Sequence, residues 1–154
     1  MNIRTYRSGD REPLVQLIKS NTPRFFRQCE IEDFKNYIDH EIEEYYVIEE
    51  GSRVIGGGGI NLFSERSLAR LSWDMVDPDH QGRGVGTLLT SYRLKRLEKK
   101  SDIQRVDVRT SQLVYKFYYK MGFRTILIRN DYWAQGIDLY HMRLELNDLR
   151  AQID

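Results

Sequence analysis

Apolar residues follow two different periods along this chain, and each period predicts a different kind of element. Val85, Leu89 and Tyr92 recur at the spacing of one helix face, which predicts an amphipathic helix with one buried side. The stretch Arg105–Thr110 alternates polar and apolar residues, which predicts a half-buried strand. Glycine, proline and asparagine separate such stretches and mark the turns.

Along the whole sequence this pattern predicts an α/β (α+β) fold with about seven strands and about four helices. Because a turn and a long helix stand between the first strands and the last ones, we expect a mixed, mostly antiparallel sheet. The strands are expected at Asn2–Tyr6, Glu44–Glu50, Arg53–Asn61, Leu68–Val76, Arg105–Thr110, Arg124–Ile128 and Asp138–Leu146, and the helices around Leu14–Ile18, at Glu32–His40, from Val85 to about Lys100 and at Val114–Met121.

The composition is that of a single globular domain spanning residues 1–154. The net charge is +1, so no overall field favours nucleic acid or a membrane surface as a partner. No apolar run approaches the roughly 20 residues that a membrane span needs, and the first residues lack the apolar core of a signal peptide. Cys29 is the only cysteine and cannot form an internal disulfide, which is consistent with a cytoplasmic location.

Charge is distributed unevenly between the two halves of the chain. The stretch Glu30–Glu50 is mostly acidic in its charged residues, whereas basic residues dominate Arg83–Arg109. Such runs usually form solvated helix faces. As functional surfaces, the basic stretch would suit an anionic cofactor and the acidic stretch a cationic amine.

Four consecutive glycines, Gly56–Gly59, stand inside the expected strand Arg53–Asn61. Glycine in a strand contributes no side chain to packing and weakens the strand. We therefore expect either a bulge or a close approach of another backbone or a ligand at this point. A flexible turn is the alternative.

A glycine-rich turn joins the expected strand Leu68–Val76 to the amphipathic helix. Its glycines let an oxyanion approach the main chain, and the first N–H groups of a helix have no acceptor within the helix. The turn is therefore expected to bind a phosphate or pyrophosphate. It does not match the Walker loop, which needs Lys and Ser/Thr after its second glycine, or the dinucleotide fingerprint, which needs glycine where Thr87 stands.

The segment Gln81–Gly86 has the spacing Gln-x-x-Gly-x-Gly. Together with the preceding Val76-x-Pro78, it resembles the acetyl-CoA-binding motif of the GNAT family of N-acetyltransferases, Arg/Gln-x-x-Gly-x-Gly/Ala. The segment Ser111–Phe123 resembles a second motif of that family, Asn-x-x-Ala-x-x-Phe-Tyr-x-x-x-Gly-Phe. The predicted order of elements is also similar to the GNAT acyl-CoA N-acyltransferase fold over nearly the whole chain.

The resemblance implies acetyl-CoA as co-substrate and assigns roles to individual residues. The main chain of Gly82–Thr87 would hold the pyrophosphate, with Gln81 bracing the turn. Met75 and Val76 would bind pantetheine through their backbone, and Ser111, in the usual place of Asn, would reach it through its side chain. The cofactor-binding residues implied in this way are Met75, Val76, Gln81, Gly82, Arg83, Gly84, Val85, Gly86, Thr87, Ser111 and Tyr118.

Tyr118 aligns with the tyrosine that protonates the coenzyme A sulfur in this family. A phenol can do so because it keeps its proton at neutral pH; a packed core aromatic is the alternative. A general base is harder to identify. Asp74 is the first candidate, since it lies close to the cofactor-binding end of its strand, and the others are Asp138, Glu49 and Glu50.

Trp73 and Trp133 are expected to line the substrate pocket together with Asp138, with burial in the core as the alternative for both tryptophans. The histidines lack the spacing of metal ligands, so no metal is expected. His80 is expected to be an exposed loop residue.

The sequence thus predicts an acetyl-CoA-dependent N-acetyltransferase in which a primary amine attacks the thioester directly. The favoured acceptor is a small cationic amine or an amino-acid-like molecule. The alternatives are an acetyltransferase acting on the N-terminus or a lysine of a protein or peptide, a catalytically silent coenzyme A-binding regulatory module, and a nucleotide-binding domain. We expect a monomer or a homodimer.

Overall fold

The computed structural model describes residues 1–152. Its sheet has seven strands in the order β1-β2-β3-β4-β5-β7-β6. The pairs β1·β2, β2·β3, β5·β7 and β6·β7 are antiparallel and β4·β5 is parallel, so the predicted mixed, mostly antiparallel sheet is confirmed. The strands are β1 Asn2–Thr5, β2 Glu44–Glu50, β3 Arg53–Phe63, β4 Leu68–Val76, β5 Arg105–Thr110, β6 Arg124–Ala134 and β7 Ile137–Glu145.

Within the described part of the chain five α-helices accompany the sheet, one more than predicted. The additional helix is α5, where Leu146 had been assigned to the last strand. Its Arg150 guanidinium donates to the carbonyl oxygens of Glu98 and Ile103, so tertiary contacts that no local pattern records hold this short helix. The helices are α1 Arg11–Ser20, α2 Glu30–Asn36, α3 Val85–Glu98, α4 Tyr115–Lys120 and α5 Leu146–Ala151.

Contacts group the chain into two compact units, which we describe one at a time. Unit 1 comprises Met1–Asn61 and Ser72–Tyr92, and unit 2 comprises Leu62–Leu71 and the chain from Arg93 onward. The glycine-rich turn belongs to unit 1, and the second motif, Ser111–Phe123, belongs to unit 2.

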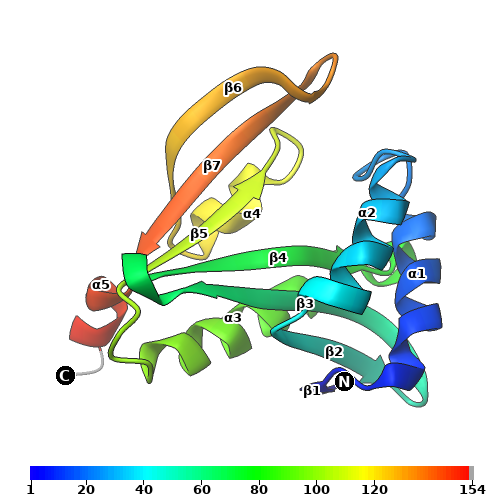
Figure 1. The fold of residues 1–154 in the computed structure, drawn as a ribbon, viewed down its shortest axis with the longest axis horizontal. Helices are drawn as coiled ribbons and strands as arrows, with labels where there is room; N and C mark the ends of the chain where they lie inside the picture. The colour runs from blue at the N-terminus through cyan, green and yellow to red at the C-terminus, as the bar shows by residue number, and fades with distance from the viewer. Residues whose placement is uncertain (153–154) are drawn as a thin grey trace. The chain divides into compact units, whose positions relative to one another are not determined.

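The core of unit 1 is built by α1 and α2, which lie side by side (Figure 1). Leu14 and Ile18 of α1 and Phe34 of α2 are fully buried together with Val47 of β2 and Met75 of β4. The apolar stripe of α1 that the sequence predicted is therefore its buried face, and removing that area from water is the main source of stability here.

The glycine run Gly56–Gly59 lies inside β3, so the flexible turn considered as an alternative is wrong. Successive residues of a strand face opposite sides of the sheet. A Cβ on Gly56 would meet Val85 Cγ1 of α3 at 2.9 Å, and a Cβ on Gly57 would meet Leu14 Cδ2 of α1 at 2.8 Å. Glycine is required because helices approach β3 closely on both faces, and the pairing with β2 also shifts register at Ile48.

Gly59→Ala is expected to lower the free energy of unfolding by about 1–3 kcal/mol, because overpacking forces neighbouring groups apart. The new Cβ would lie 2.5 Å from the hydroxyl oxygen of Tyr37 and 3.0 Å from the backbone oxygen of Glu44. Urea denaturation measures the change. Gly9→Ala is the matched control, since nothing lies within 4 Å of that position, and equal losses in the two variants would contradict the close packing at β3.

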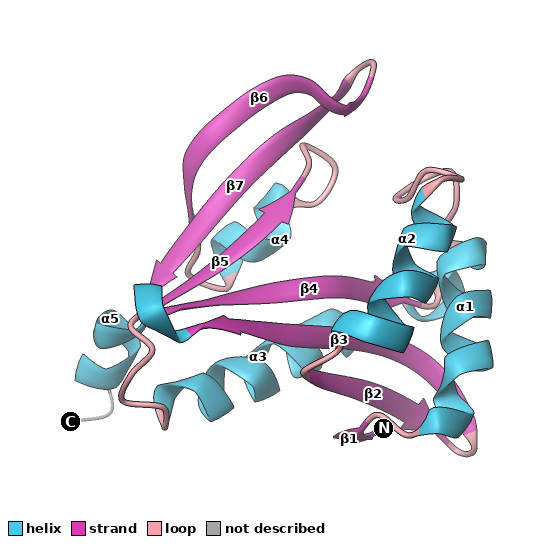
Figure 2. Ribbon diagram, viewed as in Figure 1, coloured by secondary structure: helices cyan, strands magenta, loops and turns pink. Residues whose placement is uncertain are grey.

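Unit 2 is dominated by a long hairpin of β6 and β7 (Figure 2). Only Gln135 and Gly136 separate the two strands, so the predicted loop Arg129–Ile137 is wrong. The polar residues of that stretch are typical of turns, but they lie on an edge strand that is exposed and irregular. Its register shifts between Arg129 and Ala134, and Asp131 has a positive φ of 55°.

Candidate functional site

The glycine-rich turn has the conformation that only glycine adopts easily. Gly82 has φ +75° and Gly84 has φ +84°, and a Cβ at either position would meet nothing within 4 Å. The main chain here is therefore exposed on its outer side. Helix α3 begins directly afterwards at Val85, and its first turn contains no acidic residue. Its first N–H groups have no acceptor within the helix, so the turn offers an open, electropositive cradle for an anion.

The side-chain amides of Gln81 and Asn21 fasten this turn to the rest of unit 1. Gln81 Nε2 donates to Asn21 Oδ1 at 3.2 Å and, more weakly, to the carbonyl oxygen of Val76 at 3.4 Å. Asn21 Nδ2 donates to the same carbonyl at 3.1 Å and to Leu17 at 2.9 Å. Asn21 is 3% exposed. This role could not be predicted from the sequence, because the partner Gln81 lies 60 positions away.

A cluster of charged side chains supports the other side of the turn. Asp77 is buried and binds Arg53 at 2.5 Å. His80 Nε2 lies 3.0 Å from Glu50 Oε2, and Arg83 lies 3.9 Å from the other oxygen of Glu50. His80 is therefore buried, which corrects the expectation of an exposed loop residue; the short helical turn Pro78–His80 directs its ring toward the end of β2. Glu50, a candidate base, is engaged in this cluster.

Strand β4 contains a conformational outlier at Trp73. Its φ is +55°, a left-handed conformation that is costly for a bulky residue and that occurs mostly at functional sites. The Trp73 carbonyl accepts a hydrogen bond from the Tyr45 hydroxyl at 2.9 Å. The indole packs against Phe34, with ring centroids 5.3 Å apart, and so borders the unit 1 core. Asp74 follows directly and is half-buried.

Met75 and Val76 differ in what their side chains and carbonyl groups do. The Met75 side chain is buried in the core of unit 1, and its carbonyl oxygen lies 3.3 Å from the position of a Cβ on Gly56. The Val76 carbonyl is occupied by the amides of Asn21 and Gln81. The Val76 carbonyl is therefore already engaged within unit 1.

The second motif forms helix α4 of unit 2. Tyr118 is 4% exposed and its ring lies edge-on to Phe123, with centroids 5.7 Å apart. Tyr119 is 55% exposed. Ser111 lies just before the helix, where its Oγ accepts from the Leu113 N–H at 3.2 Å. The serine thus supports the helix start, and the same oxygen would have to serve any ligand.

The candidate substrate residues of unit 2 tie the hairpin to the end of β5. Trp133 Nε1 donates to the carbonyl oxygen of Thr110 at 3.0 Å. Asp138 Oδ1 accepts from the Asp131 N–H at 2.9 Å, and the Asp138 N–H donates to Gln112 Oε1 at 2.8 Å. The Asp138 carboxylate therefore closes the hairpin. Glu49, the remaining candidate base, is paired with Arg4 in unit 1.

Asp107 of β5 is the acidic centre of unit 2, and it is 1% exposed. Its Oδ1 accepts from Arg143 Nε at 2.7 Å, and its Oδ2 lies 2.7 Å from His141 Nε2. Burial acts to raise the pKa of Asp107, but the hydrogen bonds from Arg143 and His141 outweigh it and hold this pKa below its usual range. Sequence analysis did not single out these residues, because β5 and β7 are far apart in the chain.

The lowered pKa makes the stability of the protein depend on pH on the acid side. A carboxyl group with a lower pKa in the folded state contributes stability above its unfolded pKa of about 4, and this stability is lost as the pH falls through the folded pKa. Asp107→Asn is expected to lower the free energy of unfolding by about 1–3 kcal/mol at neutral pH. The variant is also expected to lose less of its remaining stability than the wild type as the pH falls below about 4. Urea denaturation at several pH values measures both effects.

The matched control for this experiment is Asp39→Asn, because Asp39 pairs with Arg11 at the surface. That variant is expected to change stability little at any pH. If the free energy of unfolding fell as steeply at acidic pH in Asp107→Asn as in the wild type, the role of the buried carboxylate would be contradicted.

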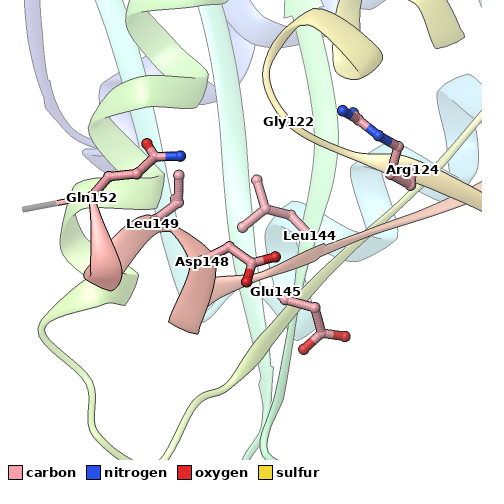
Figure 3. A pocket seen from close by; sticks show the side chains of 7 residues that line it. All are labelled: Gly122, Arg124, Leu144, Glu145, Asp148, Leu149 and Gln152. Atoms are coloured by element: carbon pink, nitrogen blue, oxygen red, sulfur yellow. The ribbon is translucent and has the colours of Figure 1, made fainter.

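A pocket of about 200 Å³ lies in unit 2 beside α5 (Figure 3). Leu144 and Leu149 form its apolar part, and Arg124, Glu145 and Asp148 stand at its rim. Its volume is below the roughly 300 Å³ at which small-molecule sites begin. It contains none of the predicted site residues.

No helix within residues 1–152 is both long enough and apolar enough to cross a membrane. In the same residues, no group of three or more His, Cys, Asp or Glu side chains is arranged to hold a metal ion.

Comparisons with known proteins identify the family of this chain. Residues 15–146 match the model of the acetyltransferase (GNAT) domain. The chain is similar to an amino-acid acetyltransferase of Vibrio vulnificus (strain CMCP6), with 24% identity over 92 residues. The aligned residues make up 57% of this chain and only 20% of that protein, so the chain spans about one fifth of this relative.

Solved structures share the fold at low sequence identity. The chain is similar to the ribosomal-protein-S18-alanine N-acetyltransferase from Escherichia coli, with a TM-score of 0.79, 18% identity and coverage of 94% of this chain and 93% of that one. It is also similar to an aminoglycoside 6'-N-acetyltransferase complexed with coenzyme A, with a TM-score of 0.77, 12% identity and coverage of 95% and 97%. These likenesses confirm the predicted fold.

Proposed function

The chain belongs to the acetyltransferase (GNAT) family, and on this basis we propose that it transfers the acetyl group of acetyl-CoA to a primary amine by direct attack. The single observation that carries the proposal is the turn from Gln81 to Thr87. Its positive-φ glycines and the N–H groups at the start of α3, which have no acceptor within the helix, support binding of a pyrophosphate.

The residues of the turn fit coenzyme A in shape and in charge. The open space beside Gly82 and Gly84 admits a phosphate to the main chain, and Gln81 keeps the turn in place through Asn21 and Val76. Arg83 is half-exposed and only loosely paired with Glu50, so its guanidinium is able to meet a phosphate. In this proposal the N–H groups of Met75 and Val76 bind pantetheine and help to polarise the acetyl carbonyl.

Acetyl-CoA, when bound, supplies an activated acetyl thioester. The attacking amine must be neutral, whereas a lysine-like amine has a pKa of about 10.4 and is mostly charged at neutral pH. We assign its deprotonation to Asp74, directly or through water, and protonation of the leaving sulfur to Tyr118. Holding the two reactants in line supplies a large part of the rate, and no covalent enzyme intermediate is required.

The acceptor we favour is a small amine, cationic or amino-acid-like. The acidic stretch near Glu41 and Glu43, which is exposed in unit 1, supports attraction of a cationic amine. The E. coli neighbour is described as acting on the alanine of a ribosomal protein, so an N-terminal peptide is the second class of acceptor to be tested.

The test is an assay of the purified chain with acetyl-CoA, a thiol-detecting dye and a broad panel of amines and peptides. We expect thiol release with at least one amine and the mass of the acetylated product. Binding of acetyl-CoA without turnover on any amine would instead indicate a silent coenzyme A-binding module. Thermal stabilisation by ATP and not by coenzyme A would indicate a nucleotide-binding domain.

A further inference from the structure

One face of unit 2 carries arginine side chains in neighbouring positions on three strands. Arg70 of β4 is in register with Asp107 of β5, and Asp107 is in register with Arg143 of β7. In the same way Arg109 is in register with His141. We call this surface the arginine face and define it by Arg70, Arg105, Asp107, Arg109, His141 and Arg143.

Helix α4 occupies the opposite face of these strands. Residues of β7 alternate between the two faces, and Tyr140 stacks on Tyr115 of α4 with ring centroids 4.6 Å apart. His141 and Arg143 bind Asp107 instead, and their side chains are 21% and 29% exposed. The arginine face is therefore accessible within unit 2.

The arginine face contains one acidic residue, Asp107, for four arginines. Both oxygens of Asp107 are occupied by Arg143 and His141. The Nε atoms of Arg70 and Arg105 are buried, and neither has a hydrogen-bond partner within residues 1–152. Arg105 stands at the start of β5 and donates through Nη2 to the carbonyl oxygen of Arg66 at 3.0 Å. Buried donors are normally paired, so the unsatisfied Nε of Arg70 indicates that a partner is missing there.

The electrostatic surroundings of Arg70 agree with this shortage. Burial lowers the pKa of Arg70, and the positive charge of Arg109 lowers it further; Asp107 opposes this shift, and Arg66 adds a smaller lowering effect. Crowding of like charges is unfavourable unless an anion lies between them. A ligand carrying negative charge would relieve it.

Aromatic rings hold two of these guanidinium groups in place. The Arg70 guanidinium lies 5.0 Å from the centroid of the Phe63 ring, and that of Arg109 lies 5.1 Å from Tyr132 and 5.7 Å from Trp133. Arg109 also donates through Nη2 to the Tyr132 hydroxyl at 2.5 Å. A guanidinium held over a ring retains further N–H groups for a pair of oxygen atoms, so both arginines are preorganised for an oxyanion.

The arginine face leads directly to the second motif. Arg109 is the penultimate residue of β5, and Ser111 follows the strand. The carboxyl end of β5 is therefore the place where the arginine face meets the second motif. Trp133, which contacts Arg109, also binds the Thr110 carbonyl at this end.

We propose that Arg70 and Arg109 bind an oxyanion of the acetyl acceptor, so that the acceptor is a small amine that also carries a carboxylate or phosphate group. This inference rests on the proposed function and, of the two kinds of small amine favoured there, selects the amino-acid-like kind, which carries an acidic group, over the purely cationic kind. Carboxylate and phosphate both present two oxygens to a guanidinium fork, and the experiment separates them.

The experiment measures acetyl transfer to each standard L-amino acid, to its carboxamide and, for the best acceptor, to its aminophosphonate analogue. In the wild type we expect kcat/KM for the carboxylate or the phosphonate to exceed that for the carboxamide by at least about tenfold. A preference between the first two identifies the source of the oxyanion.

Arg70→Gln and Arg109→Gln are expected to raise KM for the anionic acceptor by about 10- to 100-fold. KM for acetyl-CoA and turnover of the carboxamide are expected to stay unchanged. Arg70→Lys, which keeps the charge and loses the fork, should fall between the wild type and Arg70→Gln. Lys99→Gln, at an exposed position of unit 2, is the control for net charge, and circular dichroism checks folding.

Equal kcat/KM for acids and carboxamides in the wild type, with acetyl transfer intact, would overturn the anionic acceptor and leave the proposed function standing. Unchanged KM values in correctly folded Arg70→Gln and Arg109→Gln would overturn the assignment to this face. Failure of the proposed function gives a different result, namely no release of coenzyme A with any amine.

Discussion

Tyr118→Phe is expected to lower kcat by about 10²- to 10⁴-fold while leaving the Kd of acetyl-CoA nearly unchanged. A positioned general acid contributes a rate factor of this size, and a group that acts only as the reaction proceeds affects kcat more than binding. The substitution removes the phenolic oxygen and keeps the ring. Because that ring is buried against Phe117 and Phe123, phenylalanine is expected to occupy the same space.

Tyr119→Phe is the matched control, since Tyr119 is the neighbouring tyrosine on α4 and is exposed. Its kcat is expected to equal that of the wild type. Steady-state kinetics with a thiol-detecting dye measures the rates, and calorimetry measures the affinity for acetyl-CoA. A near-normal rate for Tyr118→Phe would mean that the thiolate leaves unassisted or that another group donates the proton. A lower melting temperature of Tyr118→Phe with an unchanged kcat would mean that Tyr118 contributes to packing and not to catalysis.

Gly84→Ala is expected to raise the Kd of acetyl-CoA by about 10- to 100-fold. Its Cβ would project into the open space beside the turn, where φ is +84°, and would keep a phosphate from the main-chain N–H groups. A left-handed alanine also costs about 1 kcal/mol of stability. Isothermal titration calorimetry measures the affinity.

Gly51→Ala is the matched control, because it has the same cost in stability of a left-handed alanine but lies outside the proposed phosphate site. Gly51 also has a positive φ, +64°, with nothing within 4 Å of its Cβ position, and it lies in the turn between β2 and β3. Both variants are expected to lose similar stability, and only Gly84→Ala should lose affinity. Equal Kd values in the two variants would contradict phosphate binding at Gly84.

The main elements of the fold could be predicted because their residues carry strong local periodicity. The spacing of Leu14 and Ile18 predicted α1, and the alternation of Arg105–Thr110 predicted β5. The structure buries the apolar residues of both elements, but it also buries Asp107 on the polar side of β5. Helix α5 and the second half of β6 could not be predicted, since both depend on partners distant in sequence. Arg150 caps the end of α3, and the residues after Arg129 are held by β7.

The site could be predicted only where one segment of the sequence determines its geometry. The need for glycine at Gly82 and Gly84 follows from a turn that leads into a helix, and the structure has positive φ at both. Asn21, the left-handed Trp73 and the burial of His80 escaped prediction, because each depends on groups from other strands and helices. The arginine face was missed for the same reason, since only register brings Arg70 and Arg143 to Asp107.

Whether the main-chain amides at the start of α3 bind the pyrophosphate is tested most directly by calorimetry on the wild type and Gly84→Ala, each titrated with coenzyme A and with pantetheine, which lacks the diphosphate together with the adenosine 3′-phosphate. We predict that the wild type binds coenzyme A at least about 100-fold more tightly than pantetheine, and that Gly84→Ala weakens coenzyme A binding without affecting pantetheine. Equal affinity for the two molecules, or no heat of binding with coenzyme A, would contradict it.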